Sequence, residues 1–181
     1  MNKALLVFSV MLLYACAPTG KPPHTEAETF MNKLAAHCGN AYRGQVIFPA
    51  DGTDPFAGEE LVMHVQACSD TAVMIPFTVG KDKSRTWVIR TTPEGLQLKH
   101  DHRHEDGTPD EVTMYGGVSG LPTTDLIQRF PADAHTARLI PAAATNEWTL
   151  AISPDGKTFS YILKRDNKMR FQADFDLTKP L

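Results

Sequence analysis

From Tyr42 to the C-terminus, hydrophobic and polar residues alternate with a period of two along most of the chain. This alternation is typical of a β-strand with one buried face, because successive side chains of a strand point to opposite sides of the sheet. The hydrophobic positions that alternate most regularly are Leu61, Met63 and Val65; Val73, Ile75, Phe77 and Val79; Trp148, Leu150 and Ile152; Phe159, Tyr161 and Leu163; and Met169, Phe171, Ala173, Phe175 and Leu177. The pattern predicts about eight to ten strands.

Short turn segments separate these runs: Ser69-Asp70, Pro93-Glu94-Gly95, Pro154-Asp155-Gly156 and Asp166-Asn167. Each is short enough to join two neighbouring antiparallel strands. We therefore predict an all-β, antiparallel up-and-down barrel, with a β-sandwich as the alternative. The exception is residues 131–145, which are rich in alanine and interrupted by Pro141, and which we expect to form a helical turn and a loop.

One short helix is expected before the first strand. Thr25 and Glu28 have the spacing of a capping box, in which each side chain hydrogen-bonds the other residue's backbone N–H. The hydrophobic residues Phe30, Met31, Leu34 and Ala35 then recur at helical spacing until Gly39.

The first sixteen residues have the pattern of a bacterial lipoprotein signal. Lys3 is followed by a hydrophobic run over residues 4–13, which is too short to span a bilayer as a helix. The run ends in Leu13-Tyr14-Ala15-Cys16, which resembles a lipobox, in which a small residue precedes the cysteine that receives the lipid. We expect residues 1–15 to be a signal peptide and Cys16 to be lipidated.

After Cys16, residues 16–24 are polar and rich in proline, and we expect them to be a tether. Residues 25–181 then suffice for one domain. Ala17, rather than aspartate, follows Cys16, which in well-studied bacteria resembles an outer-membrane destination. The expected location is the outer membrane, with the domain facing the periplasm.

The charge of the chain does not indicate a nucleic-acid partner or electrostatic binding to a membrane. It has 18 basic and 21 acidic residues and a net charge of −3, so nothing indicates a nucleic-acid surface or a polybasic membrane patch. Membrane attachment is therefore expected through the acyl groups alone. The oligomeric state stays open.

Two cysteines remain in the expected domain, Cys38 and Cys68. In an exported protein their most favourable state is a disulfide, which would tie the end of the helix to the end of the strand that begins at Leu61. Closing a loop of this length is expected to stabilise the fold by about 3–4 kcal/mol. The alternative is two unpaired thiols.

Histidines continue one hydrophobic strand face. Leu96 and Leu98 form the buried face of a predicted strand, and His100, His102 and His104 follow with the same parity if the strand is unbroken. The charged residues between them are then expected to face water. Two adjacent imidazoles can share zinc or another divalent transition metal, which requires a further ligand from elsewhere.

The candidates for the further ligand are Glu111, on the expected returning strand 111–115, and Asp106 or Asp110 in the turn. The alternative is that the histidines are hydrogen-bonded polar groups at the mouth of the barrel.

The sequence does not predict a catalytic serine. The segment Gly117-Val118-Ser119-Gly120 lacks the spacing and the strand-to-helix turn of a nucleophile elbow.

Several segments together resemble an uncharacterised family of secreted or lipid-anchored bacterial proteins, to which no activity is attached. The segments that carry the resemblance are Cys38-Gly39-Asn40-Ala41-Tyr42-Arg43-Gly44, Leu61-Val62-Met63-His64-Val65, Ser84-Arg85-Thr86-Trp87-Val88, Leu98-Lys99-His100-Asp101-His102-Arg103-His104-Glu105-Asp106-Gly107, Tyr115-Gly116-Gly117, Phe130-Pro131-Ala132-Asp133 and Phe175-Asp176-Leu177. The chain also loosely resembles the calycin and lipocalin barrels, with Gly39-Asn40-Ala41-Tyr42 where their Gly-x-Trp stands.

These observations favour a lipid-anchored envelope protein that binds a small molecule or a metal ion in its barrel. We expect a binding protein rather than an enzyme. One alternative is a metal-assisted hydrolase that uses the histidine strand, which would need an open metal position. Another is a structural envelope protein, which a filled barrel interior would favour.

Overall fold

The computed structural model describes residues 25–49, 51–53, 56–120 and 123–181. The expected signal peptide, Cys16 and the tether of residues 16–24 therefore lie outside the described residues. Within the described part of the chain, no helix is long and apolar enough to cross a membrane.

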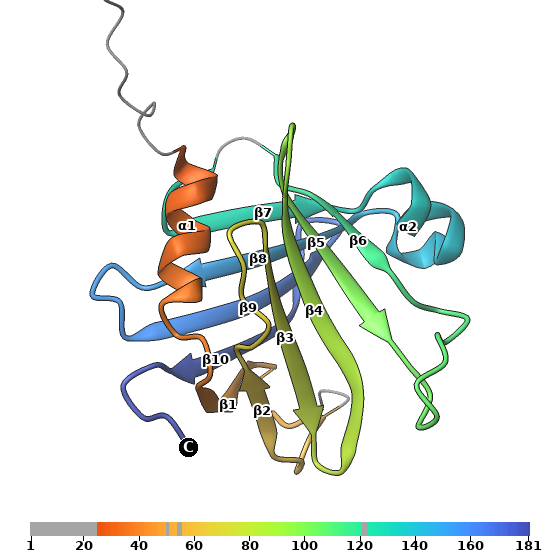
Figure 1. The fold of residues 1–181 in the computed structure, drawn as a ribbon. Coiled ribbons are helices and arrows are strands. Elements are labelled where there is room, and N and C mark those ends of the chain that lie inside the picture. Colours follow the sequence, from red (N-terminus) through yellow and green to blue (C-terminus); the bar gives the residue numbers. More distant parts are fainter. Residues whose placement is uncertain (1–24, 50, 54–55, 121–122) are drawn as a thin grey trace, which may run out of the picture.

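Ten antiparallel strands form one sheet that nearly closes into a barrel (Figure 1). The strands are β1 (Ala41–Phe48), β2 (Leu61–His64), β3 (Ala72–Val79), β4 (Asp82–Thr92), β5 (Gly95–His102), β6 (Tyr115–Val118), β7 (Ile127–Pro131), β8 (Asn146–Ile152), β9 (Thr158–Arg165) and β10 (Lys168–Asp176). Each strand pairs with the next along the chain except at β6 and β7, and β10 pairs back onto β1. The predicted up-and-down barrel is confirmed.

The seam of the barrel lies between β6 and β7. Among the described residues on its two sides, backbone hydrogen bonds cross it from Gly120 N to the carbonyl of Arg129 (2.9 Å) and from Asp133 N to the carbonyl of Gly116 (3.0 Å). A Cβ on Gly117 would lie 1.8 Å from the carbonyl oxygen of Pro131, so glycine is needed for the two backbones to approach this closely.

The helix α1 (Glu26–Ala35) covers one end of the barrel with Phe30, Met31 and Leu34, all of which are buried (Figure 1). The predicted capping box at its start is present. Cys38, just after the helix, forms a disulfide with Cys68, beyond the end of β2. The predicted disulfide is therefore confirmed, and it ties α1 to the barrel.

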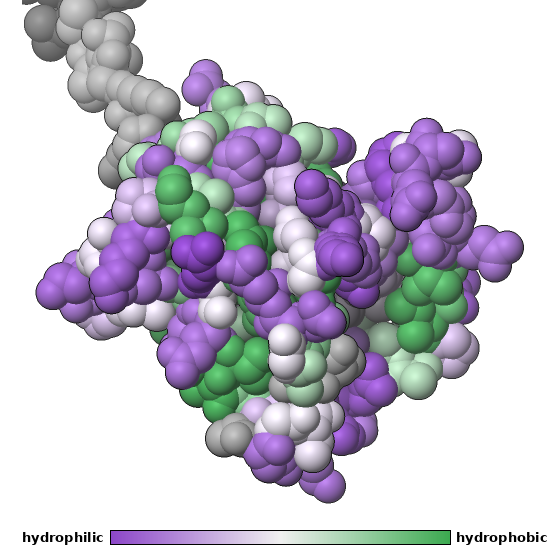
Figure 2. Space-filling model, turned by 90° about the horizontal axis from the view of Figure 1, so that it is seen from below, coloured by the Kyte–Doolittle hydropathy of each residue, from purple (hydrophilic) through white to green (hydrophobic). Residues whose placement is uncertain are grey.

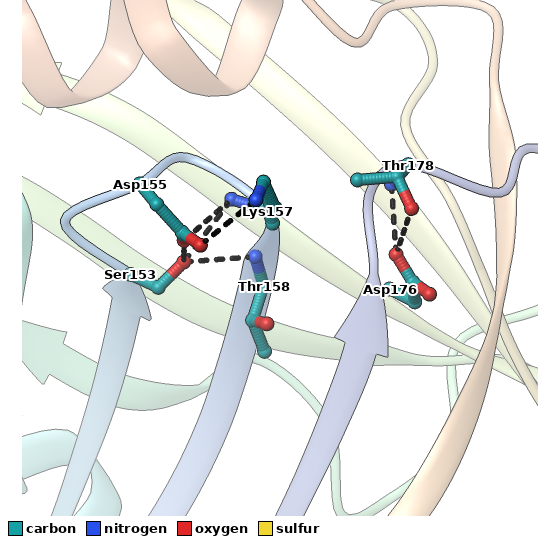
Figure 3. A network of polar contacts seen from close by, with 6 residues as sticks. All are labelled: Ser153, Asp155, Lys157, Thr158, Asp176 and Thr178. Atoms are coloured by element: carbon teal, nitrogen blue, oxygen red, sulfur yellow. Dashed lines mark hydrogen bonds and ion pairs between the residues drawn. The ribbon is translucent and has the colours of Figure 1, made fainter.

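The turn between β8 and β9 lies at the same end of the barrel as α1 (Figure 3). The hydroxyl of Ser153 donates to the carboxylate of Asp155 (2.6 Å) and accepts from the backbone N–H groups of Lys157 (3.1 Å) and Thr158 (2.9 Å). These bonds satisfy the turn's backbone donors, as expected for a serine–aspartate turn. Asp176 holds Thr178 in the same way after β10 (Figure 3).

The helix α2 (Ala134–Leu139) and the 3₁₀ helix η1 (Pro141–Ala143) pack outside the barrel beside β6 (Figure 1). Asp133 caps α2 by accepting from Thr136 N (2.8 Å), and Thr136 in turn exchanges two hydrogen bonds of 2.7 Å with the backbone of Gly116. This confirms the helical turn predicted for residues 131–145 and fixes it across the seam.

Aromatic side chains fill most of the barrel interior. The indole of Trp87 stacks on Phe77 (4.7 Å between ring centroids) and on Tyr161 (4.5 Å), and it contacts Phe159 and Phe175. The whole interior forms one continuous hydrophobic cluster that extends to α1. The barrel is therefore a packed core over most of its length.

Candidate ligand site at the open end of the barrel

The end of the barrel opposite α1 carries polar side chains on the inner face. β5 begins near the α1 end, where Leu96 N bonds Ser119, and runs to His102 at the other end. Ser119 is therefore a structural serine of the β5–β6 pair. We call the end of the barrel at His102 the mouth; it lies toward the lower right in Figure 1.

His100 is almost completely buried, and both of its ring nitrogens are hydrogen-bonded. Nδ1 lies 3.2 Å from the carbonyl oxygen of Tyr115, and Nε2 lies 2.9 Å from the hydroxyl of Tyr161. Burial lowers the pKa of His100 to about 3, so the imidazole is neutral at physiological pH. Because a carbonyl only accepts, Nδ1 carries the proton and Nε2 accepts from the hydroxyl of Tyr161.

The neutral pair of His100 and Tyr161 is thereby fixed in one orientation. Tyr115 stacks on the His100 ring at 4.6 Å between centroids, and Trp148 packs at 5.1 Å. Burial raises the pKa of Tyr161 well above its ordinary value, so the phenol stays protonated. The cluster is preorganised for hydrogen bonding rather than for carrying charge.

His102 is half-buried at the rim of the mouth. Its Nε2 lies 3.1 Å from the hydroxyl of Tyr115, and its backbone N–H donates to Thr113 Oγ1 (2.7 Å). Burial and the nearby charge of Arg85 lower the pKa of His102, while the carboxylates of Asp110 and other residues act in the opposite direction. His102 is therefore also mainly neutral near pH 7.

Arg85 supplies the positive charge of the mouth. It pairs in register with Phe77 on β3 and with His102 on β5, and its guanidinium bonds the carboxylate of Asp82 and lies 5.5 Å from the ring centroid of Phe56. Partial burial acts to raise the pKa of Asp82, but hydrogen bonds from Ser84 and Arg85 outweigh it and lower the pKa to about 2.

These side chains line a cavity of about 70 Å³. Its polar lining residues are Arg85, Thr86, His100, His102, Tyr115 and Tyr161. The aromatic residues Phe56, Phe77 and Trp87 form the rest of its lining. A cavity of this size holds a few water-sized groups. It is far smaller than the about 300–1,000 Å³ of a pocket that encloses a drug-sized ligand.

The histidine parity predicted from the sequence holds only as far as His102. β5 ends there, and His104 lies in an exposed turn, where its backbone pairs with Thr108 and Gly107. The expectation that His104 continues the inner face is therefore wrong. The chain turns back at residues 104–107, where Gly107 N donates to the carbonyl of His104 (2.9 Å).

The expected third ligands do not reach the histidine face together. Glu111 is exposed, and the strand expected at residues 111–115 begins only at Tyr115. Asp106 accepts from Thr108, and Asp110 accepts from Val112 N (2.9 Å). Among residues 25–49, 51–53, 56–120 and 123–181, no group of three or more His, Cys, Asp or Glu side chains is placed to hold a metal ion. Zinc binding by the histidines stays a prediction.

Lys99, expected to face water, is buried outside the barrel beside α2. Its Nζ lies 2.5 Å from the carboxylate of Asp133, and the side chain of Lys99 is 11% exposed. Partial burial acts to raise the pKa of Asp133, but hydrogen bonds from Lys99 and Thr136 lower it overall. Asp133 follows Lys99 by 34 residues, so the local pattern of β5 does not reveal this partner.

Sequence reasoning missed Arg85, Tyr115 and Tyr161 as site residues. A signal was present for two of them. Arg85 has the parity of Trp87 and Ile89, and Tyr161 has that of Phe159, so the alternation that identifies the core also gives both of them inner-face positions. An arginine at an inward position is the exception that marks a site.

No protein-family model matches this chain, and a search of curated proteins finds no match either. The resemblance to secreted or lipid-anchored bacterial proteins therefore stays a prediction.

Proposed function

We propose that the protein is a lipid-anchored binding protein of the bacterial envelope, attached through Cys16 to the outer membrane and facing the periplasm, which takes a small polar ligand at the mouth of the barrel. The observation that supports it is the gathering of Arg85, His100, His102, Tyr115 and Tyr161 around one cavity. Buried polar groups are costly in an otherwise hydrophobic core, and a binding site accounts for that cost.

The state of these groups favours recognition over catalysis. His100 uses both ring nitrogens within the fold, so it has no free nitrogen with which to move a proton. His102, Tyr115 and Arg85 remain at the rim, where their donors can reach a ligand. Such a site needs only a cavity and a few fixed polar groups.

The second candidate is a structural envelope protein, because aromatic side chains fill the barrel and leave only about 70 Å³. Ligand titration separates the two. Trp87 lines the cavity, so binding should change the tryptophan emission of the full-length exported protein in detergent. We expect members of a panel of small neutral and anionic polar molecules to cause a saturable change.

The variant His102→Phe should raise the dissociation constant of the ligand at least about tenfold, because it removes a polar partner from the rim. His135→Ala, at an exposed position of α2 outside the barrel, is the control and should bind as the wild type does. If no compound in the panel gives a saturable signal, the structural candidate stands instead. If His102→Phe binds as tightly as the wild type, the ligand does not bind at the rim of the mouth.

The anchor is tested separately. Cys16→Ala should release the protein from the membrane fraction and abolish labelling by a fatty-acid analogue, because the proposed attachment is through the acyl groups on Cys16. Ala17→Asp should keep the label but move the protein to the inner membrane. A Cys16→Ala protein that remains membrane-bound would refute the anchor.

A further inference from the structure

We infer that the mouth binds a short aliphatic monocarboxylate, with its carboxylate at Arg85 and a tail of about two or three carbons in the cavity of about 70 Å³. This inference rests on the proposed binding function and names the chemical class of the ligand. It is carried by three features of the cavity: a cation at the rim, aromatic walls behind that cation, and a volume that limits the tail.

The charge of Arg85 reaches the cavity from the rim. The ladder between β4 and β5 is regular from Trp87 to Arg85, so both side chains face the barrel interior. Trp87 is buried, whereas the Arg85 side chain is 26% exposed, so Arg85 lies farther out. Its charge acts to lower the pKa of both His102 and Tyr115, which also line the cavity. An anionic group that enters here therefore meets the guanidinium first.

Arg85 keeps donors for a ligand. One guanidinium nitrogen bonds the carboxylate of Asp82, which holds the group in place at the strand end. A guanidinium has five N–H donors, so others remain for a second carboxylate. Among the described residues that line this cavity, Arg85 is the one cation and none is a carboxylate, because Asp82 lies outside the lining. Since charge-assisted hydrogen bonds are the stronger ones, the cavity favours an anionic group.

Tyr115 and His102 add a neutral donor beside Arg85. The Tyr115 hydroxyl lies 3.1 Å from His102 Nε2. If the hydroxyl donates this bond, His102 keeps an N–H at Nδ1, and if Nε2 donates it, Tyr115 keeps its O–H. In either tautomer one donor of the pair is left over. A carboxylate at the rim therefore has both a charged and a neutral donor available.

Behind the rim, aromatic rings wall the cavity. Phe77, Trp87 and Tyr161 are buried, and the indole of Trp87 stacks on the other two rings. The hydroxyl of Tyr161 bonds His100 Nε2, so these polar atoms are engaged with each other. The inner part of the cavity therefore offers mainly carbon surface, which favours a hydrocarbon tail over a second polar group.

The volume of the cavity limits the length of the tail. One water occupies about 30 Å³ in the liquid, so about 70 Å³ holds roughly two groups of that size. Methyl and methylene groups are of similar size, so the tail of propionate or butyrate fills the cavity and that of hexanoate exceeds it. Figure 2, which views the molecule from below, shows hydrophilic side chains beside hydrophobic patches. Both kinds of surface are therefore exposed on this side of the molecule.

Calorimetry on the full-length exported protein in detergent tests this inference near neutral pH and at constant ionic strength. The probes are acetate, propionate, butyrate, hexanoate, sulfate and the neutral butyramide. We expect propionate to bind about fourfold more tightly than acetate, because one more CH₂ is buried, and hexanoate to bind more weakly than butyrate. Butyramide, which lacks the charge, and sulfate, which lacks the tail, should bind at least about fivefold more weakly than butyrate.

The variant Arg85→Gln should weaken butyrate binding at least about tenfold, because the charge-assisted hydrogen bonds are lost. Arg90→Gln, at an exposed position of the same strand, is the matched control and should leave binding unchanged. A folded Arg85→Gln protein that binds butyrate as tightly as the wild type would overturn the inference. The comparisons among ligands use the wild-type protein, so they hold even if this variant does not fold.

Two other results would overturn the monocarboxylate while leaving a binding protein. One is butyramide or sulfate binding as tightly as butyrate, and the other is an affinity that does not change with tail length or keeps rising to hexanoate. The same conclusion follows if compounds of the tryptophan titration bind and no monocarboxylate does. Absence of binding by every compound in both titrations would overturn the binding function itself.

Discussion

At the scale of single residues, His100 stands where the alternation of β5 would place another leucine. A buried imidazole is tolerated because both nitrogens are hydrogen-bonded and because aromatic rings pack on its faces. This arrangement favours the neutral form of His100. A protonated Nε2 could no longer accept a hydrogen bond, so the Tyr161 hydroxyl would have to turn and accept one from it. Stability should therefore depend on pH.

The direction of this pH dependence follows from the number of protons bound by the folded and unfolded states. The pKa of His100 is about 3 in the folded protein, below its ordinary 6.5, so between these values the unfolded chain binds more protons. Stability is fully present above pH 6.5 and falls as the pH drops, at about 1.4 kcal/mol per unit and thus about 2 kcal/mol by pH 5. Urea denaturation at several pH values measures this slope.

The variant His100→Gln should be less stable at pH 7 but should lose most of this slope, because glutamine does not titrate. His102, whose pKa is also lowered, leaves a smaller slope in the same direction. His104→Gln is the control at an exposed position. A His100→Gln protein with the wild-type slope between pH 7 and 5 would contradict the assignment of a buried neutral His100.

At the scale of the elements, the periodicity of the sequence predicted what depends on one strand at a time. The inner faces of β3, β9 and β10, the capping box of α1 and the short turns all follow from local patterns. The end of β5 at His102 does not, because it depends on pairing with β4, and that ladder ends at Arg85 opposite His102.

Only part of the candidate site was predicted from the sequence, for the same reason. His100 and His102 were found by parity on a single strand, whereas their partners come from β4, β6 and β9. Which strands meet at the mouth depends on barrel closure and on register. Lys99 shows this most clearly, since its burial comes from the cap of α2, which lies far along the chain.

The seam between β6 and β7 gives the element-scale prediction. Gly117→Ala would place a methyl group against the carbonyl of Pro131, so the backbones must separate, which should cost about 1–3 kcal/mol of unfolding free energy. Gly120→Ala is a matched control, because its Cβ would meet only Pro131 side-chain atoms at 3.8 Å, an ordinary contact. Equal stabilities of the two variants in urea denaturation would show that the seam is not tightly packed.

At the scale of the whole molecule, the two ends of the barrel have different roles in the proposed function. α1 and the disulfide close one end (Figure 1), and Thr25 is the N-cap of α1. The mouth lies at the other end. Residues 16–24 can span at most about 30 Å between a lipidated Cys16 and Thr25. The α1 end should therefore stay near the membrane, with the mouth toward the periplasm.

Fluorophores at two introduced cysteines test this orientation. Glu26→Cys lies in the first turn of α1, and Lys83→Cys lies at the mouth; Cys38 and Cys68 do not compete for the label because they form a disulfide. With the protein in vesicles that carry nitroxide head groups, we expect strong quenching at position 26 and weak quenching at position 83. Because the tether alone sets this difference, Cys16→Ala should abolish quenching at both positions. Equal quenching in the anchored protein would mean that the mouth also rests on the membrane, and its ligand would then have to enter from the lipid surface.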